Sequence, residues 1–187
     1  MATLFPKEFF LPDGFQYIPE FITEKEEQDL LKLISTIDLR IFIFRGFEAK
    51  RKSASFGADY HFDSRQLTPG AAIPLGFQPL IGKVTNHLSL QKEIGELLVL
   101  EYPEGAVINW HRDAPPFDVI VGISLLSDCT FLLRPHDKAK RSRKAIIRLP
   151  IERRSLYVMQ GPARNEWEHS TLPALSVRYS ITLRTLK

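Results

Sequence analysis

A histidine and an aspartate lie two residues apart, as His111 and Asp113, in the segment INWHRDAPPFDVIVGISLL. Side chains two residues apart on a strand point to the same face, so this spacing predicts that both groups face one side of a sheet. An imidazole and a carboxylate on one face can bind a transition metal. The commoner meaning is the polar face of a half-exposed strand, so the interpretation depends on a third ligand.

A third candidate ligand, His169, lies farther along the chain in the segment NEWEHSTLP. Antiparallel β folds bring together strands that are distant in sequence. Two histidines and one carboxylate form the facial triad of non-haem Fe(II) oxygenases, which leaves positions open for a co-substrate and O2. Spacing alone also allows His169 to be an ordinary exposed strand residue.

The C-terminal segment SVRYSITLRTLK favours the iron interpretation. Alternation along a strand puts Arg178, Ser180, Thr182 and Arg184 on one face. A guanidinium binds a carboxylate through two parallel hydrogen bonds. Such a face is more often solvated. Beside an iron site, however, the two arginines suit a dicarboxylate such as 2-oxoglutarate, which chelates iron at one end and needs a cation at the other.

The elements that must position these residues can be read from capping and periodicity. Thr23 as N-cap and Glu26 three residues later form a capping box, which predicts a helix over residues 23–37. Residues 77–88 favour a second helix, residues 1–22 an extended lead-in, and residues 44–74 either short strands or an ordered surface loop. Eight strands are predicted at 97–102, 106–113, 118–126, 129–135, 145–150, 155–161, 167–172 and 176–186. This pattern predicts a mainly β fold with flanking helices (α+β), a double-stranded β-helix or jelly roll.

In combination, these segments resemble the AlkB family of Fe(II)/2-oxoglutarate-dependent dioxygenases, which act in the repair of alkylated nucleic acid. The resemblance rests on YPEGAVINWHRD, GISLL, GPARNEWEHSTLP and RYSITLR, in the family's order, with a looser likeness in RKSASFGADYHF upstream. It implies Fe(II), 2-oxoglutarate and O2 as cofactor and co-substrates. It also implies oxidative demethylation of N-alkylated bases, with release of formaldehyde, succinate and CO2.

The resemblance implies a role for each residue of the motifs. The implied iron ligands are His111, Asp113 and His169. Arg178 is similar to the partner of the distal carboxylate of 2-oxoglutarate, and Arg184 to a residue near its chelating end that also steadies the aspartate. Tyr102 is similar to a tyrosine that donates a hydrogen bond to the co-substrate.

Three positions depart from the family pattern. Leu100 stands where many members have an asparagine, so one hydrogen bond to the co-substrate is expected to be absent or supplied elsewhere. Ser180 also replaces an asparagine, but its hydroxyl can still donate and is expected to bind the co-substrate. Pro115 replaces an acidic residue that is associated with the target base in many DNA-repair members, which leaves the base preference open.

The implied partner is nucleic acid, with alkylated DNA expected in preference to RNA. An alkylated base in a duplex must be flipped out to reach the iron, so basic and aromatic groups are expected around the mouth of the site. The candidates are Arg45, Lys50, Arg51, Lys52, Phe56, Tyr60 and, for stacking, Trp167. Residues 134–154 hold nine Lys or Arg against Asp137 and Glu152, and are either a phosphate-contacting surface or a solvated hairpin.

Composition sets the remaining expectations. The chain has 187 residues, one cysteine and a net charge of +3. We expect one dioxygenase domain over residues 1–187, with an N-terminal extension carrying the helices and the nucleotide-recognition lid at 1–96 and the jelly-roll core at 97–187. A cytoplasmic monomer without membrane segments is expected, because a single cysteine suits a reducing compartment and the N-terminus does not read as a signal peptide.

Three alternatives stay open. An oxygenase acting on a protein or small molecule would use the same iron and co-substrate residues. A non-catalytic nucleic-acid-binding module would not need those residues. A metal hydrolase could use the His and Asp set, but has no use for the paired arginines of the last strand.

Overall fold

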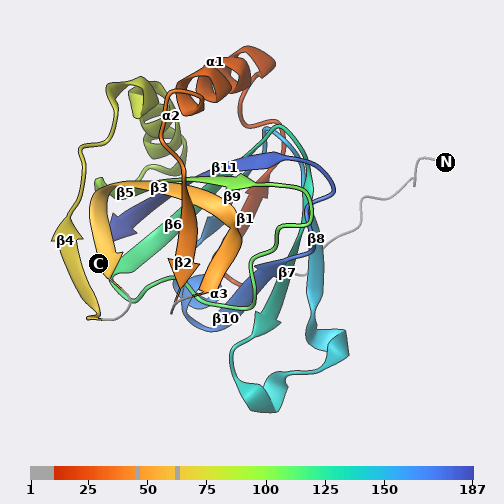
Figure 1. Cartoon of the computed structure of the whole chain (residues 1–187). Helices are drawn as coiled ribbons and strands as arrows, with labels where there is room; N and C mark the ends of the chain where they lie inside the picture. Colours follow the sequence, from red (N-terminus) through yellow and green to blue (C-terminus); the bar gives the residue numbers. More distant parts are fainter. Residues whose placement is uncertain (1–10, 45–46, 62–63) are drawn as a thin grey trace.

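Two antiparallel sheets form most of the computed structural model, which describes residues 11–44, 47–61 and 64–187 (Figure 1). Within this part of the chain, the larger sheet has the order β1-β9-β6-β11-β5-β3-β2, with β4 paired to β3, and the smaller sheet has the order β10-β7-β8. The strands are β1 Phe15–Ile18, β2 Arg40–Phe44, β3 Phe47–His61, β4 Gln66–Pro69, β5 Ile94–Tyr102, β6 Phe117–Leu125, β7 Cys129–Pro135, β8 Ile147–Ile151, β9 Leu156–Met159, β10 Trp167–Thr171 and β11 Arg178–Leu186.

Two helices cover one face of the larger sheet, α1 (Glu24–Ile34) and α2 (Gln78–Leu88). Both predicted helices are confirmed, and Thr23 and Glu26 form the predicted capping box at the start of α1. Leu30 of α1 and Val84 of α2 belong to one buried cluster with Val99 of β5 and other residues of the large sheet. None of the described helices is long and apolar enough to cross a membrane.

A second buried cluster joins the two sheets. It contains Phe117 and Ile120 of β6 together with Phe131 of β7 and Ile151 of β8. Burial of these side chains fixes the spacing between the sheets, and the functional pocket lies beside this cluster. The short helix α3 (Gly161–Asn165) connects β9 to β10, and the short 3-10 helices Leu75–Phe77, Lys138–Lys140 and Arg143–Ala145 lie in connections.

The prediction of a strand at residues 106–113 is wrong. The segment runs beside β10 but pairs with it only at separate points, and His111 forms an isolated bridge with His169. Gly105 begins the segment in a turn at a φ of 74°, and Pro115 and Pro116, which follow it, lack the backbone N–H that a continuous ladder needs. The other seven predicted strands are confirmed, with shifts of a few residues at their ends.

In the N-terminal half, β1 was not predicted, and residues 47–61, which the sequence left open between short strands and a surface loop, form a strand. Residues 15–18 of the expected lead-in form β1, which pairs with β9. Residues 47–61 form the long strand β3, which pairs with β5 in the large sheet. Strands from before residue 97 therefore share a sheet with the predicted core, while the assignment of residues 1–96 as a separate extension stays a prediction.

Candidate active site

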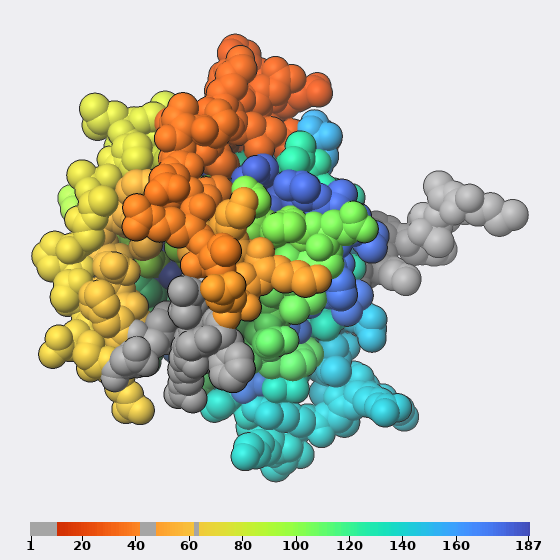
Figure 2. Space-filling model, viewed as in Figure 1, coloured from red at the N-terminus to blue at the C-terminus, as the bar shows by residue number. Residues whose placement is uncertain are grey.

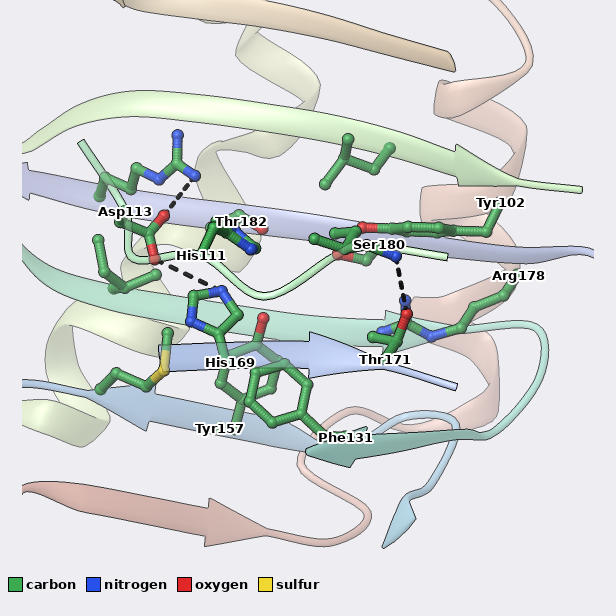
Figure 3. A pocket seen from close by; sticks show the side chains of 15 residues that line it. Tyr102, His111, Asp113, Phe131, Tyr157, His169, Thr171, Arg178, Ser180 and Thr182 are labelled. Carbon is green, nitrogen blue, oxygen red and sulfur yellow. Dashed lines mark hydrogen bonds and ion pairs between the residues drawn. The ribbon is translucent and has the colours of Figure 1, made fainter. Parts of the chain in front are cut away.

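A pocket lies between the large sheet, the small sheet and the segment that precedes β6 (Figure 3). The larger sheet contributes residues of β5 and β11, and the smaller sheet contributes residues of β7 and β10. The pocket brings together all of the residues to which sequence motifs give a metal or co-substrate role: Tyr102, His111, Asp113, His169, Arg178, Ser180 and Arg184.

The two histidines are held by backbone pairing. His111 N donates to His169 O over 3.1 Å, and His169 N donates to His111 O over 2.9 Å. Their ring centroids lie 4.1 Å apart. His111 Nδ1 lies 2.8 Å from the carbonyl oxygen of Asn109, which can only accept, so Nδ1 carries a proton and the neutral tautomer of this ring has its lone pair on Nε2. This leaves Nε2 available as a ligand atom.

The buried carboxylate of Asp113 is only half satisfied. Its Oδ1 accepts from an NH2 group of Arg184 over 2.6 Å, whereas its Oδ2 has no hydrogen-bond partner among the described residues and lies 3.7 Å from His169 Nε2. Burial alone would raise the pKa of Asp113, but Arg184 and the two histidines outweigh it and hold this pKa well below its usual range. Burial, followed by the neighbouring His111, lowers the pKa of His169 to about 3. The carboxylate is therefore charged and the imidazole neutral, the forms that bind metals.

The donor chemistry of these three side chains fits Fe(II), because two imidazoles and a carboxylate with a free oxygen make up a facial triad. Over residues 11–44, 47–61 and 64–187, no set of three His, Cys, Asp or Glu side chains is already closed around one point as a metal centre. The three candidates share one pocket with Asp113 Oδ2 and His169 Nε2 turned toward each other, so metal binding would have to draw their donor atoms together.

Two residues without a motif support the aspartate. Glu96 of β5 accepts from the other NH2 group of Arg184 over 2.5 Å, so that Arg184 links Glu96 to Asp113. Arg164 of α3 is 5% exposed and donates to the carbonyl oxygens of Asp113, Ala114 and Phe117. Glu96 interrupts the apolar run of the strand IGELLVLEY, which is a sequence signal for it, but no local pattern indicates Arg164.

The opposite end of the pocket carries a buried cation. Arg178 is 4% exposed, its Nε donates to Ser124 Oγ of β6 over 3.0 Å, and its guanidinium carbon lies 5.1 Å from the ring centroid of Tyr102. Arg178 forms no ion pair with any residue that the structure describes. A buried charge without a counter-ion is costly, so this end of the pocket suits an anionic ligand.

The candidate nucleic-acid residues on β3 divide between its two faces. Lys52 pairs with Glu101 and Phe56 with Leu97, and Phe56 packs against the helix-covered core. Ser53 pairs with Leu100, which faces the pocket, so alternation puts Arg51 on the pocket face.

The remaining candidates lie elsewhere. The electrostatic interaction of Arg51 with Tyr102 agrees with its place on the pocket face. Lys50 is exposed, Tyr60 packs against the cluster between the sheets, and Arg45 lies outside the described residues. Trp167 is half-buried at the start of β10 and lines a second cavity together with His136 and Lys140, away from the central pocket.

The basic run at residues 134–154 forms the β7–β8 hairpin with its 3-10 turns, which projects at the lower edge of the molecule in Figures 1 and 2. Several of its cations already have acidic partners: Arg134 and Arg141 bind Glu168, and Arg153 binds Glu27. Exposed cations of the 3-10 turns that form no ion pair with any described residue are Lys138, Lys140, Arg143 and Lys144.

Residues 14–184 match the family model of the 2OG-Fe(II) oxygenase superfamily. Similar proteins include the tRNA (carboxymethyluridine(34)-5-O)-methyltransferase ALKBH8 of Mus musculus, 26% identical over 170 residues that cover 87% of this chain and 25% of that protein. The alkylated DNA repair protein ALKBH8 homolog of Arabidopsis thaliana is 26% identical over 190 residues, 90% of this chain and 53% of that protein. The DNA oxidative demethylase ALKBH2 of Homo sapiens is 29% identical over 153 residues, 73% of this chain and 56% of that protein. This chain thus spans about a quarter to about half of these relatives.

Solved structures share the fold. The structure of OsALKBH1 superimposes with a TM-score of 0.74 at 13% identity, over 96% of this chain and all of that chain. A prolyl hydroxylase from Trichoplax adhaerens, solved with a peptide fragment of the hypoxia inducible factor oxygen degradation domain, gives a TM-score of 0.65 at 18% identity, over 93% of this chain and 84% of that chain. These likenesses confirm the predicted mainly β jelly roll with flanking helices.

Proposed function

The chain belongs to the 2OG-Fe(II) oxygenase superfamily, and from this membership we propose that it demethylates N-alkylated bases in nucleic acid. Members of the superfamily use Fe(II), 2-oxoglutarate and O2, and the AlkB-like relatives identify this chain as a dioxygenase of that type. When bound, iron, 2-oxoglutarate and O2 together supply the oxidation of the methyl group, with formaldehyde, succinate and CO2 as products.

One observation carries the proposal. Among the described residues, one end of the pocket has a carboxylate oxygen of Asp113 without a hydrogen-bond partner, near His111 and His169, and the other end has a buried arginine without an ion pair. We assign His111, Asp113 and His169 as the iron ligands and Arg178 as the partner of the distal carboxylate of 2-oxoglutarate. This arrangement matches a dicarboxylate that chelates a metal and needs a cation at its far end.

The other pocket residues position these groups. Arg184 orients Asp113 through its ion pair, and Glu96 fixes Arg184 in turn. Both NH2 groups of Arg184 already bind carboxylates, those of Glu96 and Asp113. We therefore propose that Arg184 mainly orients Asp113 and does not bind the co-substrate directly. Tyr102 and Ser180 present hydroxyl groups beside Arg178, where they can donate to a bound carboxylate.

The proposed substrate is alkylated DNA in preference to RNA. One relative is named as a DNA oxidative demethylase and another as a tRNA methyltransferase, so the names of the relatives point to both nucleic acids. Arg51, on the pocket face, and the four exposed cations of the hairpin turns supply positive charge for a phosphate backbone. A cytoplasmic monomer belongs to the same proposal. Pro115 stands where many DNA-repair members have an acidic residue that is associated with the target base. An oxygenase acting on a protein or small molecule is therefore the second candidate.

The test is a panel of methylated single- and double-stranded DNA and RNA oligonucleotides, incubated with Fe(II) and 2-oxoglutarate. Reversion of the base is measured by mass spectrometry, with reactions lacking 2-oxoglutarate and reactions of His169→Ala as controls. We expect reversion of the base by the parent protein with 2-oxoglutarate, and none without 2-oxoglutarate or with His169→Ala. Turnover of 2-oxoglutarate with no reversion of any base would contradict the nucleic-acid substrate and favour the second candidate.

A further inference from the structure

Tyr157 of β9 presents a polar group to the pocket that no motif singled out. The residue lines the pocket and is 7% exposed, and Figure 3 shows it beside His169. Its hydroxyl group forms no hydrogen bond with any residue in the described part of the chain. Burial raises the pKa of this phenol, so the group keeps its proton and remains a donor.

The neighbouring strand makes room for this side chain. Tyr157 pairs with Gly122 of β6, and Gly122 pairs with Thr182 of β11, so the three residues form a row across three strands. A Cβ atom at Gly122 would lie 2.2 Å from Cζ and 2.5 Å from Oη of Tyr157. Only a residue without a side chain allows the ring to lie across β6 and carry its hydroxyl toward β11.

One position of β5 on the pocket wall carries no donor, although Tyr102 of the same strand does. Leu100 pairs with Ser180 of β11, lines the pocket, and has no polar side-chain atom. It stands at the position where many AlkB-like proteins have an asparagine. A bound carboxylate next to Arg178 and Ser180 therefore has one hydrogen-bond donor fewer on the β5 side.

We propose that Tyr157 donates a hydrogen bond to a carboxylate of bound 2-oxoglutarate and so supplies the donor that Leu100 does not. This inference rests on the proposed function, because it requires 2-oxoglutarate in the pocket. Gly122 takes part by leaving the space that the tyrosine ring occupies.

The experiment is a calorimetric titration of 2-oxoglutarate into the Mn(II)-loaded protein, which measures binding without turnover. Tyr157→Phe keeps the ring and removes the donor. A hydrogen bond to a charged group contributes about 1.5–3 kcal/mol, so we expect affinity to fall by about tenfold to about a hundredfold. Tyr17→Phe is the matched control, because the Tyr17 hydroxyl accepts from Glu152 N outside the pocket, and its affinity should equal that of the parent.

A double-mutant cycle separates a direct contact from a change in packing. Leu100→Asn should improve binding more in the Tyr157→Phe background than in the parent. In the parent, the Tyr157 hydroxyl already donates to the carboxylate, whereas Tyr157→Phe has lost this donor. Equal affinities of Tyr157→Phe and the parent, with Arg178→Ala weakened, would overturn the role of Tyr157 and leave the proposed function standing. No binding by the parent protein would overturn both.

Discussion

Arg178 donates its Nε–H to Ser124 Oγ over 3.0 Å, from the neighbouring strands β11 and β6. Both residues are buried, and the bond uses one of the five N–H donors of the guanidinium. Since Arg178 has no ion pair among the described residues, its positive charge is available to an anionic ligand. Ser124 therefore orients the cation that we assign to the distal carboxylate of 2-oxoglutarate.

Replacement of Arg178 should weaken co-substrate binding. A charge-assisted bond contributes about 1.5–3 kcal/mol, so Arg178→Ala is expected to raise the Kd for 2-oxoglutarate by about 10- to 100-fold in the Mn(II)-loaded protein. Ser124→Ala should have a smaller effect in the same direction, because the cation remains but loses its orientation. An unchanged Kd in Arg178→Ala would show that another cation binds this carboxylate.

The ligand assignment predicts loss of turnover with retention of the fold. His111→Ala, Asp113→Ala and His169→Ala should each abolish 2-oxoglutarate turnover at limiting Fe(II), because each removes one of three donor atoms. A chelator should inactivate the parent, and added Fe(II) should restore it. Circular dichroism checks the fold, and His61→Ala, at an exposed histidine outside the pocket, is the control. Full turnover in any one ligand variant contradicts the triad.

The Glu96–Arg184 pair should stabilise the fold as well as the site. Removal of one partner of a buried ion pair typically costs about 3–5 kcal/mol of stability. In Glu96→Gln, Arg184 still has its ion pair with Asp113, so we expect a loss near the lower end of this range. Urea denaturation measures the loss in free energy of unfolding. Glu93→Gln removes an exposed acid three residues away and should change stability little. Equal stability of the two variants would show that Arg184 does not depend on Glu96.

The β7–β8 hairpin should bind phosphates through its exposed cations. We predict that replacing Lys138, Lys140, Arg143 and Lys144 with Ala weakens binding of all sequences about equally. The slope of log affinity against log salt should flatten by about 0.7–0.9 for each phosphate that is no longer neutralised. Turnover of 2-oxoglutarate without nucleic acid should persist. The control is the double variant Lys25→Ala/Lys32→Ala on α1, away from the hairpin, whose salt slope should equal that of the parent. An unchanged slope in the hairpin variant would contradict the prediction and make Lys50 and Arg51 the next candidates for phosphate binding.

The capping box predicts how stability responds to acid. The hydrogen bond from Lys83 outweighs burial and lowers the pKa of Glu26 below its usual value of 4.5. A carboxylate with a depressed folded-state pKa stabilises the fold above its unfolded-state pKa, and this contribution is lost as the pH falls through the folded-state value. Glu26→Gln should therefore be less stable than the parent at neutral pH, and the difference should shrink below pH 4.5. Chemical denaturation of both proteins at several pH values measures this difference in stability. A difference that stays constant with pH would contradict the proposed link between the pKa of Glu26 and stability.

Local signals in the sequence determined much of this protein. The capping box at Thr23 and Glu26 depends on contacts within four residues, and the polar face of β11 depends on alternation along one strand. Both were readable because helix and strand periods are properties of the local backbone. The order of the motifs around His111, Asp113 and His169 likewise predicted which residues would line one pocket.

Only the tertiary structure decided how the histidines, the aspartate and their supports meet. His111 and Asp113 lie on a segment that pairs at isolated points, not on the predicted strand, because prolines and a turn interrupt the ladder. Tyr157 reaches the pocket across Gly122 on another strand. Such contacts depend on which strands become neighbours, and pairing between distant strands is set by burial of the whole core. The spacing of residues along the chain does not by itself determine which distant strands pair.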